Sequence, residues 1–374
     1  MASTRWLLVL MLWLLPRLQM VKSGYSVQKF KTDKTWDSPV VIPKDGVYLV
    51  SLICSPCKGC KGTLEVYCLC RGQVLYIVQA PITGIYTHAE VAVGLKKSDK
   101  LFLNANRAKV EAASSLSVVY VAELNSFYIT ALNSRLTSRS PVTYTFQLRP
   151  DGWLWLKDAD KKTTFNVPAT GMYWVIGHAR PLSKSLILTV RSGPKDLFFV
   201  YGEKVKPVST SGAFRLTAGS TILMVTHGGV TYQAGTSLSV VYLAGNKKPN
   251  TYPFEHLAFT AKMQEKQIMS LKLVIDFKRV LTNYGYMYIE GYTEIRRTGS
   301  YMISLRPDPE SASLVTTNLY INGKVYWLIF AQQGVPTGAT ISLELQVGSY
   351  LHVKSSTYST YGSGTMFSVA FIQP

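Results

Sequence analysis

The chain has 374 residues, a formal net charge of +19 and 16% charged side chains. This length suits two or three domains of ordinary size. Long runs of like charge are few, so a disordered charged tail is not expected, and the basic surplus is scattered over loops and strand ends. On a secreted chain, such a surplus implies attraction to anionic surfaces.

Residues 1–23 are predicted to be a signal peptide. Arg5 precedes an apolar run, Trp6–Leu15, and Pro16 ends it, so cleavage is expected after Ser23. The run is too short to cross a bilayer, which takes about 20 residues. A retained signal anchor is the alternative. Since no second apolar run follows, we expect a secreted, extracellular protein with no transmembrane segment.

Strand patterns dominate the rest of the chain. Val47–Ile53, Leu186–Val190 and Ile341–Leu345 are short, rich in β-branched or aromatic residues, and bounded by turn formers. Lys262–Lys272 is the one candidate for a helix, and a loop before a strand explains it equally well. We therefore predict an all-β protein.

Two sequence elements recur three times. A Gly-x-Tyr element is followed at nearly constant distance by a strand that contains a serine. The distances from this glycine to this serine are 71, 68 and 69 residues for the pairs Gly46 and Ser117, Gly171 and Ser239, and Gly299 and Ser368. The chain is therefore predicted to contain three diverged copies of one unit.

The predicted units span residues 24–123, 124–245 and 246–374. Each has the size and the many short strands of a two-sheet jelly roll. The second unit opens with Phe127–Ala131, and the third opens around Phe259. Transferring the 40-residue interval from Phe259 to Gly299 onto Gly46 reaches back to residue 6, inside the leader. The first unit is therefore expected to lack, or to borrow, its opening strand.

The third unit carries the most specific motifs, in a fixed order: Phe259-Thr260-Ala261, Phe277-x-x-Val280-Leu281-Thr282-Asn283, Gly299-x-Tyr301, Asn322-Gly323, Leu343-x-Leu345-x-x-Gly348 and Phe367-Ser368. This order resembles the globular-head (C1q) domain of the C1q/TNF-like superfamily. Two positions depart from the family pattern: Ser349 replaces an Asp, and Val369 replaces a Gly. The first departure weakens any calcium site inherited from the family.

The resemblance implies jelly rolls that assemble as trimers, and a fold shared with tumour-necrosis-factor cytokines. The linkers between the units are short, and no collagen-like Gly-X-Y stem is present. We therefore expect the three units to close a self-contained pseudo-trimer within one chain, because a closed ring satisfies each heterologous interface. Three separate beads on a string are the alternative.

All five cysteines fall in the first unit: Cys54, Cys57, Cys60, Cys68 and Cys70. Their close spacing fits zinc, but an oxidising compartment favours disulfides. Two disulfides across this hairpin would compensate for the missing strand. Because five is odd, one thiol is left over or pairs with another chain.

Catalytic motifs are missing from the sequence. The five histidines are dispersed, without a second ligand at metal spacing, and no nucleophile elbow or phosphate loop is found. Asp308 and Glu310 lie in a loop interrupted by a proline. Two carboxylates make a poor calcium cage, since calcium takes 6–8 oxygens. We expect a non-enzyme that needs no cofactor.

Basic pairs are the remaining signal. The middle unit has 13 basic and 5 acidic side chains, so it is the most cationic of the three. The candidate anion-binding residues are Lys161, Lys162, Lys204, Lys206, Arg296 and Arg297. The family resemblance implies innate recognition of anionic glycans or microbial surfaces. A TNF-like signalling ligand and a matrix component are the alternatives, and a dedicated nucleic-acid partner is not expected.

Overall fold

The computed structural model describes the chain in separate segments. They comprise residues 26–30, 39–54, 62–70, 73–82, 87–106, 114–122, 128–133, 136–137, 146–149, 152–155, 164–179, 186–202, 208–227, 231–232, 236–245, 257–269, 274–284, 287–289, 291–311, 315–331 and 338–373. The predicted signal peptide, residues 1–23, lies outside them. Every element in these segments is a strand, as predicted.

The strands form three pairs of sheets, one pair for each unit, and within a pair we call the sheet that faces the other units the inner sheet. In the first unit the inner sheet has the order β1 (Ser26–Phe30), β8 (Ser115–Ala122), β3 (Gly46–Cys54), β6 (Thr87–Leu95). The outer sheet has the order β2 (Val40–Val41), β7 (Lys100–Asn106), β4 (Gly62–Cys70), β5 (Gln73–Ile82).

The second unit repeats this order with two added strands. Its inner sheet runs β12 (Gly152–Trp155), β11 (Phe146–Arg149), β9 (Tyr128–Asn133), β20 (Thr236–Gly245), β14 (Gly171–Ala179), β17 (Val208–Leu216). Its outer sheet runs β13 (Thr164–Asn166), β18 (Thr221–His227), β15 (Leu186–Ser192), β16 (Lys195–Gly202). A short pair, β10 (Leu136–Thr137) and β19 (Thr231–Tyr232), completes it.

The third unit has five strands in each sheet. Its inner sheet runs β23 (Arg279–Tyr284), β21 (Ala258–Lys262), β32 (Met366–Gln373), β26 (Gly299–Arg306), β29 (Ala339–Leu345). Its outer sheet runs β24 (Tyr288–Ile289), β25 (Tyr292–Glu294), β30 (Tyr350–Ser355), β27 (Val315–Ile321), β28 (Lys324–Ala331). β22 (Gln267–Met269) pairs with β31 (Ser359–Tyr361).

The opening strand of the first unit corrects the sequence-based expectation. β1 pairs antiparallel with β8, and Gln28 lies opposite Ser117, as Thr260 lies opposite Ser368 in the third unit. The first unit therefore has its opening strand. The prediction was wrong because the chain between this strand and the glycine is much shorter in the first unit, with 18 residues from Gln28 to Gly46. Only the later part of the repeat keeps its length.

The Gly-x-Tyr element has the same local structure in all three units. The tyrosine hydroxyl donates a hydrogen bond to the carbonyl oxygen four residues earlier, at 2.6–2.7 Å. A β-bulge directly precedes each tyrosine, and an aromatic ring from the closing strand meets it edge to face. The tyrosines are Tyr48, Tyr173 and Tyr301. The repeat thus encodes one corner that is built three times.

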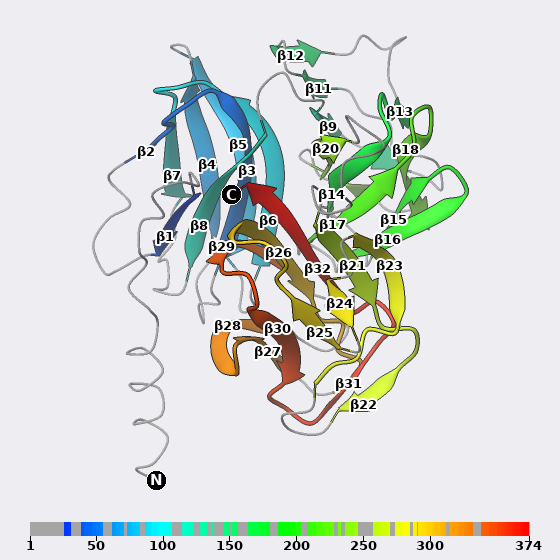
Figure 1. The fold of residues 1–374 in the computed structure, drawn as a ribbon. Helices are drawn as coiled ribbons and strands as arrows, with labels where there is room; N and C mark the ends of the chain where they lie inside the picture. Colours follow the sequence, from blue (N-terminus) through cyan, green and yellow to red (C-terminus); the bar gives the residue numbers. More distant parts are fainter. Residues whose placement is uncertain are drawn as a thin grey trace.

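The three units close a ring around a common centre (Figure 1). β6 packs against β9 and β20, β17 packs against β21 and β32, and β29 packs against β3 and β8. Each unit therefore uses the edge of its inner sheet to contact the next unit, and the third returns to the first. This is the predicted pseudo-trimer, and it rules out separate beads.

A glycine permits one of these close approaches. A Cβ atom on Gly338 would lie 2.7 Å from the carbonyl oxygen of Ser209, in the second unit. Substituting Gly338→Ala is expected to lower the free energy of unfolding by about 1–3 kcal/mol, because neither backbone can yield without separating the units. Chemical denaturation measures the loss. Glu344→Ala, at an exposed position on β29, the strand that follows Gly338, is the control, and equal midpoints for both variants would contradict this packing.

Candidate functional site

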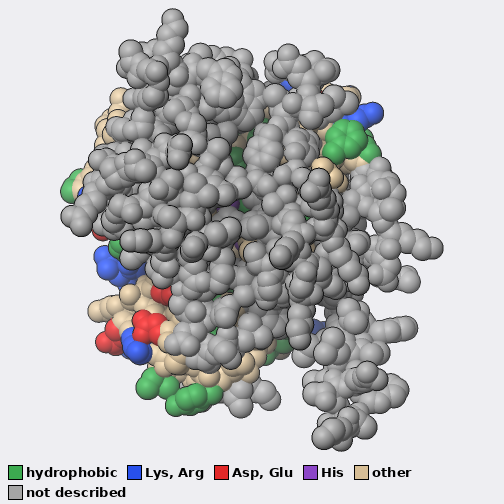
Figure 2. Space-filling view, turned by 180° about the vertical axis from the view of Figure 1, so that it is seen from behind, with side chains coloured by type: hydrophobic (Ala, Val, Ile, Leu, Met, Phe, Trp, Pro, Cys, Tyr) green, Lys and Arg blue, Asp and Glu red, His purple; other side chains and the backbone are tan. Residues whose placement is uncertain are grey.

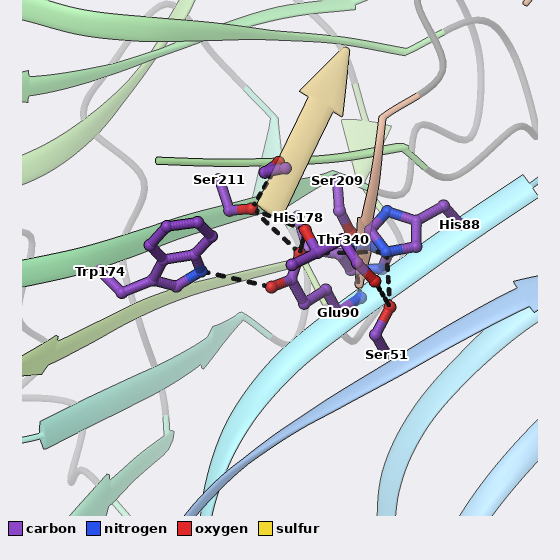
Figure 3. Close-up of polar contacts among 9 residues, drawn as sticks. Ser51, His88, Glu90, Trp174, His178, Ser209, Ser211 and Thr340 are labelled. Atoms are coloured by element: carbon purple, nitrogen blue, oxygen red, sulfur yellow. Dashed lines mark hydrogen bonds and ion pairs between the residues drawn. The ribbon is translucent and has the colours of Figure 1, made fainter. Parts of the chain in front are cut away.

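Three polar side chains meet where the units converge. Glu90, Ser211 and Thr340 occupy corresponding positions of β6, β17 and β29, opposite Ser51, Ile176 and Ser304 in their respective sheets. The Glu90 Oε2 atom accepts hydrogen bonds from Ser211 Oγ at 3.1 Å and from Thr340 Oγ1 at 2.9 Å (Figure 3). One carboxylate and two hydroxyls therefore lie around the pseudo-threefold axis.

Glu90 is fully buried. Its other oxygen, Oε1, accepts a hydrogen bond from the indole Nε1 of Trp174 at 3.4 Å. Burial raises the pKa of Glu90 from 4.5 to about 7, because desolvation outweighs the three hydrogen bonds that favour the charged form. The carboxyl group is therefore protonated at mildly acidic pH.

Two histidines flank this carboxyl group, although they are dispersed in the sequence and no motif predicts that they meet. His88 Nε2 lies 2.9 Å from Ser51 Oγ, and His178 Nδ1 lies 2.8 Å from Ser209 Oγ (Figure 3). Ser209 Oγ also accepts a hydrogen bond from the backbone N–H of Glu90 at 3.1 Å. Burial lowers the pKa of His88 to about 3, so this imidazole stays neutral. We call these residues, with Glu90, Ser211, Thr340 and Trp174, the axial cluster.

The axial cluster does not have the geometry of a nucleophilic relay. A serine–histidine–acid relay uses both nitrogens of the imidazole. Here Ser51 and Glu90 both face Nε2 of His88, the latter at 3.9 Å, and Nδ1 has no partner among the described residues. With each of these side chains at most 3% exposed, the cluster joins the units and offers no open surface to a ligand.

The outer sheet of the third unit presents an open surface instead. One residue from each of its five strands lies in a single cross-strand row: Ile289, Tyr292, His352, Tyr320 and Val325. We call this the aromatic row. At about 4.8 Å between strands, it extends for about 19 Å across the sheet. The opposite face of the same strands is buried in the core, through Leu351 and Val353 among others.

The rings of the aromatic row are close to one another. The His352 ring stacks on Tyr320 at 5.0 Å with an interplanar angle of 9°, and it lies 5.4 Å from Tyr292. The Lys354 Nζ atom lies 4.8 Å from the Tyr320 ring centroid. Burial lowers the pKa of His352, and the charge of Lys354 lowers it further. The row therefore combines a neutral aromatic surface with one cation.

Much of the aromatic row is exposed to solvent. Ile289, Tyr292 and Val325 are 46–53% exposed, and Tyr350, two residues before His352, is 50% exposed. His352 Nε2 and Asn318 Oδ1 have no hydrogen-bond partner among the described residues. The exposed residues of the row are apolar or aromatic, which is the composition of a binding face, whereas His352 and Asn318 are buried between them and the core.

Two of the six cations predicted from sequence, Arg296 and Arg297, lie in the described part of the chain. Arg296 forms an ion pair with Glu294 at 2.6 Å, and Arg297 lies over the Phe371 ring at 4.9 Å. Lys161, Lys162, Lys204 and Lys206 lie outside the described residues. Figure 2 shows basic and acidic side chains interspersed at the lower end of the molecule, among the residues that are coloured by type.

The cysteines are described in part. Cys54 is a buried thiol whose pKa is raised to about 12 by burial, and Thr87 forms a hydrogen bond with it. It is therefore not one of the bridging cysteines. Cys68 is buried on β4, whereas Cys57 and Cys60 lie outside the described residues, as does the side chain of Cys70. Disulfides among these four stay a prediction.

The two acids considered for calcium face cations. Glu310 forms an ion pair with Lys266 at 2.8 Å, and Asp308 lies near the buried Arg306. Within the described segments, no group of three or more His, Cys, Asp or Glu residues is placed to hold a metal ion. Nor does any helix there have the length and apolar character to cross a membrane.

No family model and no curated protein matches this chain. Among solved structures, the N-terminal CBM22-1–CBM22-2 tandem domain of Xyn10C from Paenibacillus barcinonensis is similar at 11% identity, with 64% of this chain and 94% of that chain covered and a TM-score of 0.21. A triple jelly-roll protein of an archaeal virus is similar at 10% identity, with 93% and 88% covered and a TM-score of 0.21. These low TM-scores carry no functional argument.

The axial cluster makes a prediction about pH. Between pH 4.5 and 6.5 the native state holds one proton on Glu90, and the unfolded state holds one on His88, so their contributions to stability cancel. In Glu90→Gln the native state holds none. Stability should then fall as pH falls through this window, by up to about 1.4 kcal/mol per pH unit.

Denaturant unfolding at several pH values measures this difference. The wild-type profile should be nearly level across the window relative to that of Glu90→Gln. Glu344→Gln, which removes an exposed carboxylate, should behave as wild type. Parallel profiles for wild type and Glu90→Gln would contradict the assignment of the buried proton to Glu90.

Proposed function

We propose that this protein is a secreted, non-enzymatic recognition protein that binds glycans through the aromatic row. The observation that carries the proposal is the line of rings across the outer sheet of the third unit, in which Tyr292 is 46% exposed, Tyr320 is partly exposed and His352 is buried beside them. Tyrosine offers a flat apolar ring with a polar tip, which suits the apolar face and hydroxyl rim of a pyranose. Secretion rests on the leader pattern in residues 1–23.

The length and composition of the aromatic row favour an oligosaccharide over a single sugar as the ligand. The row extends for about 19 Å, so it is long enough to contact several successive rings. Lys354 supplies a cation at the centre, and Glu294 with Arg296 supplies polar groups at one side. The ligand class proposed is an oligosaccharide or polysaccharide, with acidic sugars favoured by Lys354 and by the net charge, which is 19 − 3 = +16 once Arg5, Arg17 and Lys22 are removed with the leader.

Membership of the C1q-like group is also part of the proposal. It is supported by the motifs of the third unit, by the strand order that all three units share, and by the closed ring that they form. Fusion of the three units in one chain leaves the outer sheets facing outward (Figure 1). Each outer sheet is therefore available to recognise a ligand without disturbing the ring.

A glycan array probed with the full mature chain tests the proposal. Wild type is expected to bind polysaccharides, and the double substitution Tyr292→Ala and Tyr320→Ala is expected to weaken binding by about 5- to 150-fold, because each aromatic contact is worth about 0.5–1.5 kcal/mol. Tyr358→Ala is the matched control, since Tyr358 is 68% exposed but lies outside the row.

Two results would overturn the proposal. One is a wild-type protein that binds no glycan on the array. The other is a double variant that folds, by thermal unfolding, and binds as tightly as Tyr358→Ala.

A further inference from the structure

One end of the inner sheet of the third unit concentrates positive charge. Lys262 lies directly opposite Arg279 on β23, and on its other side it pairs with Met366. Met366 in turn pairs with Arg306 on β26. Three cations and one methionine therefore form a single row across four neighbouring strands, which we call the cationic row.

The cationic row faces the second unit. Met366 belongs to the hydrophobic core cluster of the second unit, and Leu281, two residues after Arg279, packs against that cluster. The Lys262 Nζ atom lies 5.7 Å from the ring centroid of Phe199 on β16. β17 packs against β21, β23, β26 and β32. The row thus lies at the junction between the second and third units.

The described acids do not balance these cations. Asp196 is near Lys262, but its Oδ1 atom already lies 2.7 Å from Arg191 Nε. Asp308 is near Arg306. Like charges directly opposite each other destabilise an antiparallel pair. The opposition of Lys262 and Arg279 therefore acts against folding unless something else compensates for it.

Arg306 has a buried donor that no described residue satisfies. The residue is 3% exposed, and its NH1 atom donates a hydrogen bond to the carbonyl oxygen of Gly364 at 2.9 Å. Its Nε atom has no partner among the described residues. A buried donor without an acceptor is costly, and more so on a charged group. A planar guanidinium offers parallel N–H groups that match the oxygens of an oxyanion.

We propose that the cationic row is an oxyanion-binding site that takes a sulfate or phosphate group at the junction of the second and third units. Arg306 supplies the buried N–H donor, Lys262 and Arg279 supply charge, and the bound anion relieves the repulsion between them. The site is separate from the aromatic row and does not depend on the proposed function. The anion is either free in solution or carried by a sulfated or phosphorylated polymer.

Thermal unfolding with inorganic sulfate and phosphate tests the site. The melting temperature of the wild type should rise and saturate as the anion is added, relative to chloride at matched ionic strength. Sulfate also stabilises proteins without binding, but that effect does not saturate. Lys262→Met should lose the saturating rise. Without the anion it should melt no lower than wild type, because it removes one of two positive charges that face each other.

Lys278→Met is the matched control, since it removes an exposed cation next to Arg279 and should keep the full rise. Equal responses of wild type and Lys262→Met would overturn the proposal, as would a wild type that shows no saturating rise. Isothermal titration with inorganic sulfate gives a second readout, in which Lys262→Met should bind at least tenfold more weakly.

A sulfated oligosaccharide distinguishes the two sources of the anion. Tighter binding of the oligosaccharide than of inorganic sulfate identifies a polymer-borne group, whereas equal affinities identify the free anion. Both titrations are repeated on the double variant Tyr292→Ala and Tyr320→Ala. Retained sulfate binding there would show that this site stands even if glycan binding through the aromatic row fails.

Discussion

The structure depends on the convergence of three equivalent strand edges on one buried carboxyl group. Glu90, Ser211 and Thr340 hold the same position in three copies of one unit, yet only one of them is ionisable. A trimer of identical chains would place three carboxylates together, and like charges at this separation would repel strongly in a buried site. Fusion of the units in one chain allows one acceptor to meet two hydroxyl donors.

The ring around this centre accounts for the burial of polar residues on the inner sheets. Backbone N–H groups of one unit find side-chain hydroxyls of the next: Ala92 donates to Ser239 at 3.4 Å, and Ala213 donates to Thr260 at 3.0 Å. These strand edges would otherwise be open to other chains, which is a common route to aggregation. Closing the ring therefore gives backbone N–H groups of the edge strands a hydrogen-bond acceptor, and it fixes the relative positions of the units.

The outer sheets are under no such constraint, and they have diverged. The row positions that hold Tyr292, His352 and Tyr320 in the third unit hold Thr164, Leu223 and Arg191 in the second. The second unit therefore has no aromatic surface at these positions. Because the ring contacts come mainly from the inner sheets, a ligand-binding surface on an outer sheet can change in one unit without affecting the assembly. The aromatic row is accordingly an asymmetric feature of the third unit.

The sequence by itself determined the repeat, and with it the all-β architecture. The interval from the glycine to the closing serine predicted which strands are equivalent, because this part of the unit has nearly constant length. It failed for β1, since the connection after the opening strand varies in length. The sequence pattern could not predict the axial cluster, because Glu90, Trp174 and Thr340 lie far apart in the chain and only the closed ring brings them together.

Part of the aromatic surface can be read from one strand, because Tyr350, His352 and Lys354 alternate along β30 and so lie on one face. Its other rings come from β25 and β27, so the row exists only through sheet register. The same holds for Lys262, Arg279 and Arg306, which are isolated cations in sequence. Strand patterns are local and survive in the sequence. Sites built across strands depend on pairing and on the packing of whole units, and only the tertiary structure decides those.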